Sequence, residues 1–362
     1  MKIRVKRYLR TSEISRIGEE ILLGLGFLEQ TGFKLYITDF IFELLSLADG
    51  SDIDKIYKSL LIKYPYVEKD HFFGVVQELI KSGVLENVDL WEKNVQFDKM
   101  RYDRHLVFYS MFNENPIEVQ ELLRKKRVAL IGVGGIGSWV GQLLTAAGIG
   151  ELVLVDDDRI ELSNLTRQTL FDTSVIGEFK AYVAAERLKK INPETILTPI
   201  IKAINSVEDA LMCINKTDFV ILSADTPGDI HEWMESACIE LNTPYSPTGY
   251  VEYYGFVGPI VVPGQTPCYD CRRSSSTYLE DTEFKEQVDN IDSRFQPPSF
   301  GPINAVVASI QSGEAIKFLT GIFQASTLHK RLSINFMNWE TEYKEYRKRT
   351  HCNCVTNVEV SN

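Results

Sequence analysis

The hydrophobic pattern of the first part of the chain predicts a small mixed domain. The apolar runs 22–28 and 33–37, separated by a turn that contains glycine, predict two strands. Apolar side chains then recur at helical spacing in further segments, which are residues 39–47, 53–64 and 72–80. Pro65 and Gly83 end the last two of these helices. This order of elements predicts a winged-helix-like domain over residues 1–92.

A different pattern follows a polar linker near residues 87–104. Short, continuous apolar runs predict buried strands at residues 127–133, 151–155 and 219–222. The segment 139–147, between the first two strands, has helical spacing. Because strands that alternate with helices favour a mostly parallel sheet, we expect an α/β domain over residues 93–362. This domain also contains a long polar segment at 272–299, which precedes an apolar helix at 302–319.

The composition is that of an ordinary globular protein, with 44% hydrophobic and 25% charged residues. The formal net charge of -11 disfavours nucleic acid as the main partner, because phosphate contacts require a basic surface. No apolar run is long enough for a secretory signal or a membrane span. We therefore expect a cytoplasmic enzyme without a nucleic-acid or membrane partner.

A glycine-rich loop is the first feature that indicates chemistry. Residues 132–137 read Gly-Val-Gly-Gly-Ile-Gly and lie between a predicted strand and a predicted helix. Glycines here let the backbone approach a phosphate, and the helix N-terminus supplies N–H donors. An acidic residue ends the next strand, where it can accept hydrogen bonds from ribose hydroxyls. The predicted nucleotide-binding residues are Gly132, Gly134, Gly135, Gly137 and Asp156. This pattern alone favours NAD, with a ligand-free turn as the weaker alternative.

Two cationic residues change that picture. Arg167 lies in the stretch Asn-Leu-Thr-Arg-Gln at residues 164–168, and Lys180 follows it. A hydride-transfer enzyme has no need of these charges beyond its second strand, whereas nucleotidyl transfer must neutralise a triphosphate and a departing pyrophosphate. Taken separately, Arg167 and Lys180 are more simply interpreted as solvated surface charges. Combined with the glycine loop, they favour nucleotidyl transfer.

Several motifs then occur in a recognisable order along the chain. They are Arg101-Tyr-Asp-Arg104, Asp156 with Asp158, the stretch 164–168, Lys180 and Ser223-Ala-Asp225. With these motifs the sequence resembles the ubiquitin-activating enzymes and their bacterial ThiF-like relatives, which adenylate the C-terminus of sulfur-carrier proteins. The resemblance covers about residues 101–354. It implies an ATP-dependent adenylyltransferase with a Rossmann-like domain.

The resemblance also implies roles for individual residues. Asp156 and Asp158 match the acidic strand end, and Asp225 falls where the family holds magnesium. The residues that match the phosphate-binding set are Asn164, Arg167, Gln168 and Lys180. Arg104 matches an arginine that reaches into the site of a partner subunit. The predicted assembly is therefore a homodimer, and the predicted ligands are ATP and Mg2+.

Within this family the sequence most resembles peptide nucleotidyltransferases of the microcin C type. Two further stretches carry this similarity, Cys-Tyr-Asp-Cys at 268–271 and Ser-Arg-Phe-Gln-Pro-Pro-Ser-Phe-Gly-Pro-Ile-Asn at 293–304. Such enzymes carry an N-terminal peptide clamp, which implies that residues 1–92 bind a small precursor peptide. The alternatives are a sulfur-carrier adenylyltransferase, an enzyme that fuses side-chain carboxylates into a ring as in pantocin biosynthesis, and a DNA-binding winged helix, which the acidic charge disfavours.

Paired cysteines resemble the family's structural zinc site, which is a tetrahedron of thiolates. The predicted ligands are Cys268, Cys271, Cys352 and Cys354. The second pair has one residue between its cysteines where two are expected, so three interpretations stay open: a strained site of four cysteines, a site that uses His351 with Cys354, and no metal. The remaining cysteines are Cys213 and Cys238. Cys238 lies in a predicted helix, where a small buried residue is the commoner role, and we predict no thioester step at either position.

Overall fold

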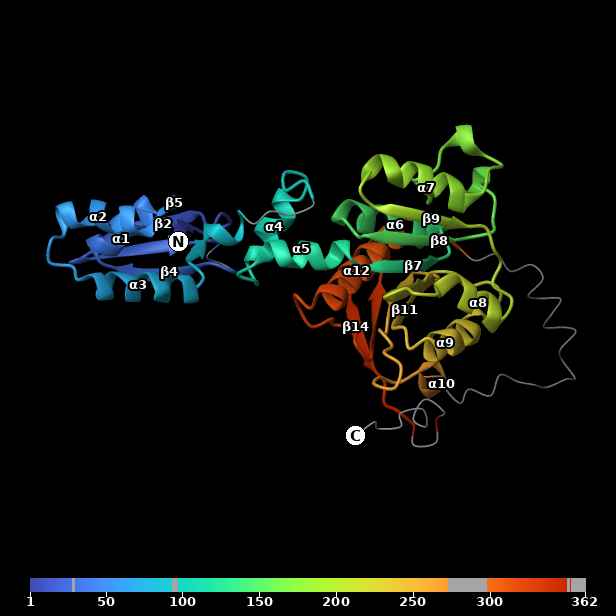
Figure 1. The fold of residues 1–362 in the computed structure, drawn as a ribbon. Coiled ribbons are helices and arrows are strands. Elements are labelled where there is room, and N and C mark those ends of the chain that lie inside the picture. The colour runs from blue at the N-terminus through green and yellow to red at the C-terminus, as the bar shows by residue number, and fades with distance from the viewer. Residues whose placement is uncertain (28–29, 93–96, 273–297, 350–351, 353–362) are drawn as a thin grey trace, which may run out of the picture. The chain divides into compact units, whose positions relative to one another are not determined.

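The computed structural model describes residues 1–27, 30–92, 97–272, 298–349 and 352. The chain divides into two compact units, residues 1–121 and residues 122–362. Figure 1 colours the first unit from blue to teal and the second from green to red. No helix in the described part of the chain is both long enough and apolar enough to cross a bilayer.

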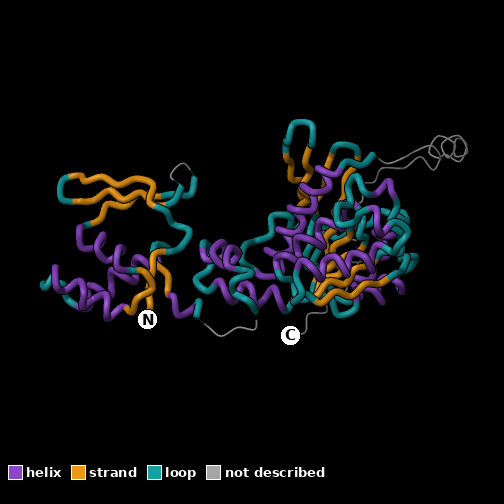
Figure 2. Tube along the Cα trace, turned by 90° about the horizontal axis from the view of Figure 1, so that it is seen from above, coloured by secondary structure: helices purple, strands orange, loops and turns teal. Residues whose placement is uncertain are grey.

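The N-terminal unit contains two small antiparallel sheets, with the strand orders β5-β1-β6 and β2-β3-β4. Their strands are β1 (Lys2–Val5), β2 (Thr11–Ile17), β3 (Glu20–Leu25), β4 (Phe33–Ile37), β5 (Asp49–Asp52) and β6 (Leu85–Asn87). The helices that begin in this unit are α1 (Asp39–Leu47), α2 (Ile53–Lys63), α3 (Lys69–Lys81), α4 (Asp103–Ser110) and α5 (Pro116–Arg124). Figure 2 shows the strands β2 to β4 on one side of this unit and helices on the other.

The helices predicted from periodicity are confirmed as α1, α2 and α3. Local chemistry explains where α2 begins, because the Asp52 carboxylate accepts a hydrogen bond from the Asp54 backbone N–H at 3.0 Å. The apolar helix faces meet in a common core around Leu44, Phe72 and Val76, which are fully buried. The expected winged-helix-like combination of helices with a small sheet is therefore present.

Strands β1, β2 and β5 were not predicted from the sequence, and for β2 and β5 the composition explains why. Almost every side chain of β2 is exposed, so the apolar alternation that marks a half-buried strand is missing. Strand β5 is Asp-Gly-Ser-Asp, which has the composition of a turn but pairs with β1. Residues 97–121, which the sequence assigned to the second domain, belong to the first compact unit. There the buried Lys6 ammonium donates to the Ser110 carbonyl oxygen at 2.7 Å.

The C-terminal unit is built on one sheet with the strand order β14-β13-β12-β11-β10-β7-β8-β9. Its strands are β7 (Arg127–Ile131), β8 (Glu151–Val155), β9 (Ile196–Ile200), β10 (Phe219–Leu222), β11 (Tyr245–Val251), β12 (Tyr254–Val257), β13 (Lys330–Asn335) and β14 (Thr341–Glu345). The helices are α6 (Gly135–Ala147), α7 (Lys180–Ile191), α8 (Val207–Ile214), α9 (Ile230–Glu240), α10 (Tyr269–Arg272) and α12 (Gly301–Thr320). Neighbouring strands among β7 to β11 pair in parallel. Strands β12, β13 and β14 then extend the sheet with antiparallel pairing. The predicted mostly parallel α/β fold is confirmed.

Helices cover both faces of this sheet (Figure 1). Strand β7 shows the division: Val128 and Leu130 belong to one buried cluster, and Ala129 and Ile131 to another. The first cluster includes residues of α6, α7 and α12, and the second includes residues of α8 and α9. Burial on both faces explains why the sequence shows a continuous apolar run here.

The order of the strands creates a crevice at one edge of the sheet. Strand β7 lies between β8 and β10, so the connections that leave β7 and β10 run to opposite sides. In open α/β sheets, ligands bind at the carboxyl ends of the strands beside such a switch point. The glycine loop, Asp156 and Asp225 follow β7, β8 and β10 respectively, which places all of them at this edge.

Candidate functional site

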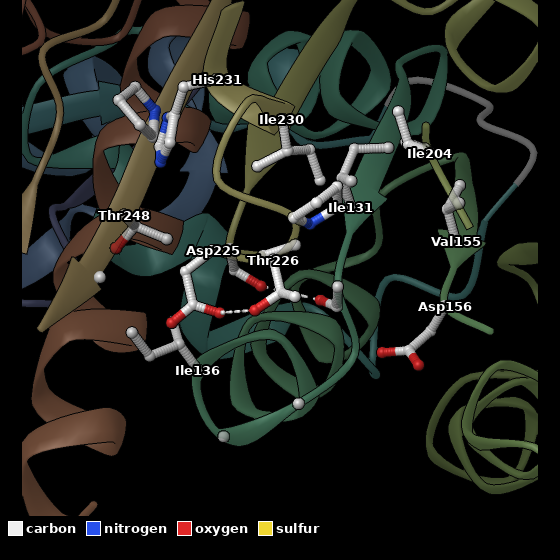
Figure 3. Close-up of a pocket in the computed structure, with 18 of the residues that line it drawn as sticks. Ile131, Ile136, Val155, Asp156, Ile204, Asp225, Thr226, Ile230, His231 and Thr248 are labelled. Carbon is white, nitrogen blue, oxygen red and sulfur yellow. Dashed lines mark hydrogen bonds between the residues drawn. The ribbon is translucent and has the colours of Figure 1, made fainter. Parts of the chain in front are cut away.

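A cavity of about 840 Å³ lies at the carboxyl ends of β7, β8 and β10. Most of the predicted nucleotide-site residues line it, namely Gly132, Gly134, Gly135, Asp156, Asp158, Arg167, Gln168, Lys180 and Asp225. Figure 3 shows Asp156 and Asp225 on either side of the loop that follows Ile131. Residues far apart in sequence thus line one cavity.

Glycine occupies the positions of this loop for different structural reasons. Gly132 has φ +87°, and a Cβ there would lie 2.9 Å from the backbone nitrogen of Ala224. A Cβ on Gly137 would overlap the carbonyl oxygen of Gly132, so this glycine allows α6 to pack against the loop. At Gly134, the N-cap of α6, a Cβ would meet only the Gln168 amide nitrogen, at 3.8 Å. Gly134 therefore leaves space for a ligand, whereas Gly137 is required for packing and does not line the cavity.

Asp156 is held by backbone donors. Its Oδ2 accepts from the Val133 N–H at 2.7 Å, and its Oδ1 accepts from the Asp158 N–H at 2.9 Å. Burial raises the pKa of this carboxyl group, and the nearby Lys180 ammonium opposes that effect. These hydrogen bonds hold the carboxylate at the end of β8, beside the glycine loop.

Lys180 is the first residue of α7 and is only 5% exposed. Its ammonium nitrogen lies 2.6 Å from Oδ2 of Asp158, whose side chain is 68% exposed. The ion pair compensates for the burial of the ammonium and fixes it at the cavity wall.

The segment 164–168 contributes in two ways. Asn164 is buried, and its Oδ1 accepts from the Glu161 N–H at 3.1 Å, so it shapes the turn and does not line the cavity. Arg167 donates to the Ser163 carbonyl oxygen at 2.9 Å and does line it. The Gln168 side chain is 2% exposed, and its Oε1 has no hydrogen-bond partner among the described residues.

The opposite wall contains residues that the sequence did not identify. His231, Tyr269, Arg272 and Arg331 line the cavity together with residues of β11 and β12. His231 stacks on the Tyr269 ring, with ring centroids 5.6 Å apart. Burial, reinforced by the Arg272 charge, lowers the pKa of His231. Only Tyr269 and Arg272 had a local signal, because they lie within and beside the Cys-x-x-Cys motif.

A cluster of thiols lies at α10. The Sγ atoms of Cys268, Cys271 and Cys352 lie within 4.8 Å of one another, and those of Cys268 and Cys352 are 3.2 Å apart. Burial would raise the pKa of Cys271, but a hydrogen bond from the Arg349 N–H and contacts with the other thiols lower it overall. Three converging thiols suit three positions of a tetrahedral zinc site. Cys354 and His351 lie outside the described residues, so the fourth ligand stays a prediction.

The remaining cysteines are buried in the sheet-packing cluster of α8 and α9. Burial raises the pKa of Cys213 to about 11 and raises that of Cys238 strongly. The thiolate form that a thioester would require is therefore disfavoured at both positions.

Known proteins resemble this chain over most of its length. The chain matches the ThiF family over residues 102–356. It belongs to the ThiF family. The chain is 31% identical over 227 residues to the sulfur carrier protein ThiS adenylyltransferase of Escherichia coli, which covers 62% of this chain and 83% of that protein. It is 29% identical over 224 residues to the molybdopterin-synthase adenylyltransferase of Escherichia coli, with coverages of 62% and 83%.

Solved structures extend the similarity to nearly the whole chain. Escherichia coli MccB with MccA-N7isoASN has a TM-score of 0.80 and 28% identity, and the match covers 99% of this chain and 100% of that one. The structure of MccB with ATP has a TM-score of 0.77 and 28% identity, with coverages of 98% and 99%. PaaA, at 22% identity and a TM-score of 0.70, shows the fold alone. The prediction of an ATP-binding adenylyltransferase is confirmed.

Proposed function

We propose that this chain adenylates the C-terminus, or a side-chain carboxylate, of a small ribosomally made precursor peptide in the biosynthesis of a microcin C-like antibiotic. This proposal rests on how much of the chain the similar proteins match. MccB structures match 98–99% of the chain, the N-terminal unit included, whereas the ThiS adenylyltransferase matches 62%. One matching MccB structure is a complex with MccA-N7isoASN, and another is a complex with N-formylated MccA.

The cavity suits a displacement at the α-phosphate of ATP. A peptide carboxylate oxygen forms the new bond to phosphorus, the bond to the bridging oxygen breaks, and pyrophosphate leaves with that electron pair. A carboxylate needs no general base. Arg167 and Lys180 line the end of the cavity beside the glycine loop, where the negative charge on the leaving pyrophosphate has to be stabilised. Asp156 is the acceptor for ribose hydroxyls.

Magnesium would be held by Asp225. Its exposed carboxylate follows β10 at the cavity wall, and an oxygen ligand of this kind is what Mg2+ prefers. Bound there, the ion would neutralise part of the charge on the phosphates. The Thr226 hydroxyl lies 3.4 Å from the Asp225 carboxylate and is the neighbouring group that orients it (Figure 3).

Arg104 lies on α4 in the N-terminal unit. We infer that it acts in the site of a second copy of the chain, so that the functional assembly is a homodimer with two sites. The N-terminal unit would bind the leader part of the peptide by adding a strand to an exposed sheet edge. Replacing alternate amides of the leader with N-methyl amides should then weaken binding.

The sulfur-carrier hypothesis is the second candidate, because the curated relatives of 31% identity act on ThiS by name. The same adenylate could also drive ring formation between side chains. Pyrophosphate exchange separates peptide adenylation from sulfur-carrier adenylation. The peptide proposal expects exchange with short peptides encoded beside the gene and none with ThiS. Mass spectrometry of the peptide product distinguishes nucleotide transfer from ring formation. Exchange with ThiS alone would sink the peptide proposal.

A further inference from the structure

Three cations line the cavity without a ligand role in the function proposed above, namely Lys202, Arg272 and Arg331. Arg331 lies on β13, at the wall farthest from the glycine loop in strand order. Neighbouring strands lie about 4.8 Å apart, so the four strand steps from β7 to β13 separate their backbones by about 19 Å. This position is unsuited to the phosphates that the glycine loop holds.

The guanidinium of Arg331 is orientated, and no described residue pairs with it. Its Cζ lies over the Phe256 ring, 4.6 Å from the centroid, in a cation–π contact that holds the planar group in place. Its buried Nε has no hydrogen-bond partner, and no carboxylate among the described residues forms an ion pair with it. By contrast, Lys180 and Lys202 pair with Asp158 and Asp209 at 2.6 and 2.7 Å. Because Arg331 lines the cavity without a counterion among the described residues, its remaining guanidinium N–H groups are available to a ligand anion.

The neighbouring strand leaves room for that acceptor. Gly249 of β11 is the partner of Phe256 across the strand pair, so both face the same side of the sheet. A Cβ at Gly249 would meet no atom within 4 Å. Across the cavity, the Arg331 guanidinium therefore lies over β12, open space lies over β11, and Asp225 lies at the end of β10. A carboxylate in that space would bind Arg331 on one side and face the α-phosphate on the other.

We propose that Arg331, held over Phe256, binds the C-terminal carboxylate of the acceptor peptide and orients it above Gly249 for attack on the nucleotide. This inference rests on the proposed function and assigns its acceptor subsite. A guanidinium suits the task because its N–H groups match the two oxygens of a carboxylate. One oxygen stays hydrogen-bonded while the other forms the bond to phosphorus, and no proton has to be removed.

The test uses the full-length enzyme and two pools of short synthetic peptides of random sequence. One pool has a free C-terminal carboxylate and the other a C-terminal amide. Immobilised enzyme is incubated with each pool and a non-hydrolysable ATP analogue, and the retained peptide is quantified by mass spectrometry. The variants are Arg331→Gln, Gly249→Val, which fills the open space, and the control Lys330→Gln. Lys330 lies beside Arg331 and loses the same charge, but it pairs with Glu345 and does not line the cavity.

The wild-type enzyme and Lys330→Gln should retain the carboxylate pool at least about tenfold better than the amide pool, as expected for a charged hydrogen bond. Arg331→Gln should retain both pools equally and bind the ATP analogue with unchanged affinity by calorimetry. Gly249→Val should retain less peptide. Equal retention of both pools by the wild-type enzyme would overturn the assignment, as would a preserved preference in Arg331→Gln or a loss of its nucleotide affinity. If the wild-type enzyme retained neither pool, the peptide substrate itself would be wrong.

Discussion

The Lys180 ammonium is buried, although lysine is rarely found inside a protein without a partner. Its partner, Asp158, is largely exposed, so the pair lies where a phosphate can approach the ammonium from the cavity. Solvent screening limits what such a half-exposed pair adds to stability. We therefore interpret the pair as a device for positioning charge rather than for stabilising the fold.

Replacing Lys180 with methionine should impair catalysis far more than folding. Removal of a positioned charge from a transition state costs about 10²–10³ in rate, and an apolar side chain of similar length fits the buried site. Pyrophosphate exchange should fall by that factor while the melting temperature changes little. Lys190→Met, on the exposed last turn of the same helix, is the matched control and should behave as wild type. Wild-type exchange by Lys180→Met would contradict the assigned role.

At the scale of elements, the β7–α6 connection combines a packing requirement with a binding requirement. Gly137 lets the helix approach the loop, and Gly134 lets a ligand approach the helix. Both glycines belong to one sequence motif, but the structure separates their functions.

Two alanine substitutions should separate these functions experimentally. Gly137→Ala should destabilise the protein by about 1–3 kcal/mol or more, the usual cost of overpacking, and lower its melting temperature. Gly134→Ala should leave the melting temperature near that of wild type, because its Cβ has room. That Cβ should nevertheless raise the KM for ATP. The opposite ranking, with Gly134→Ala the less stable variant, would show that the loop is packed differently.

The number of zinc ligands in the thiol cluster can be measured. If zinc closes the cluster, purified protein should contain about one zinc ion per chain by elemental analysis. Cys271→Ser should lose the metal and lower the melting temperature, whereas Cys213→Ser, a buried thiol outside the cluster, should keep it. Comparing Cys354→Ser with His351→Ala identifies the fourth ligand, since only the ligand's replacement removes zinc. Metal-free wild-type protein would leave the thiols without this role.

At the scale of the whole molecule, the role that we propose for Arg104 in the site of a partner makes complementation the direct test. Arg104→Ala and Lys180→Met should each be inactive alone. Mixed after dissociation and reassociation, they should regain about a quarter of wild-type exchange, because half the dimers are mixed and one of their two sites is intact. No recovery in a mixture that size measurements show to contain dimers would place Arg104 in its own chain's site.

Much of the nucleotide side of the site was predictable from the sequence. The glycine loop, Asp156 and Asp225 each follow a strand that local patterns predict, and parallel strands bring their carboxyl ends to one edge. Arg167 and Lys180 were predicted from their charges and from the family resemblance. Hydrophobic periodicity also predicted the helices α1 to α3, and the helical setting of Cys238 predicted its buried state. These features depend on spacing along the chain, which a sequence displays directly.

Only the tertiary structure decided the other wall of the cavity. Phe256, Gly249 and Arg331 meet because β11, β12 and β13 pair in a particular register, and no local pattern encodes that pairing. The exposed strand β2 escaped prediction for the same reason, since its pairing with β3 supplies what its composition does not show. The sequence by itself determined the family chemistry and the nucleotide site. Long-range strand pairing determined which residues form the wall where we propose that the acceptor carboxylate lies.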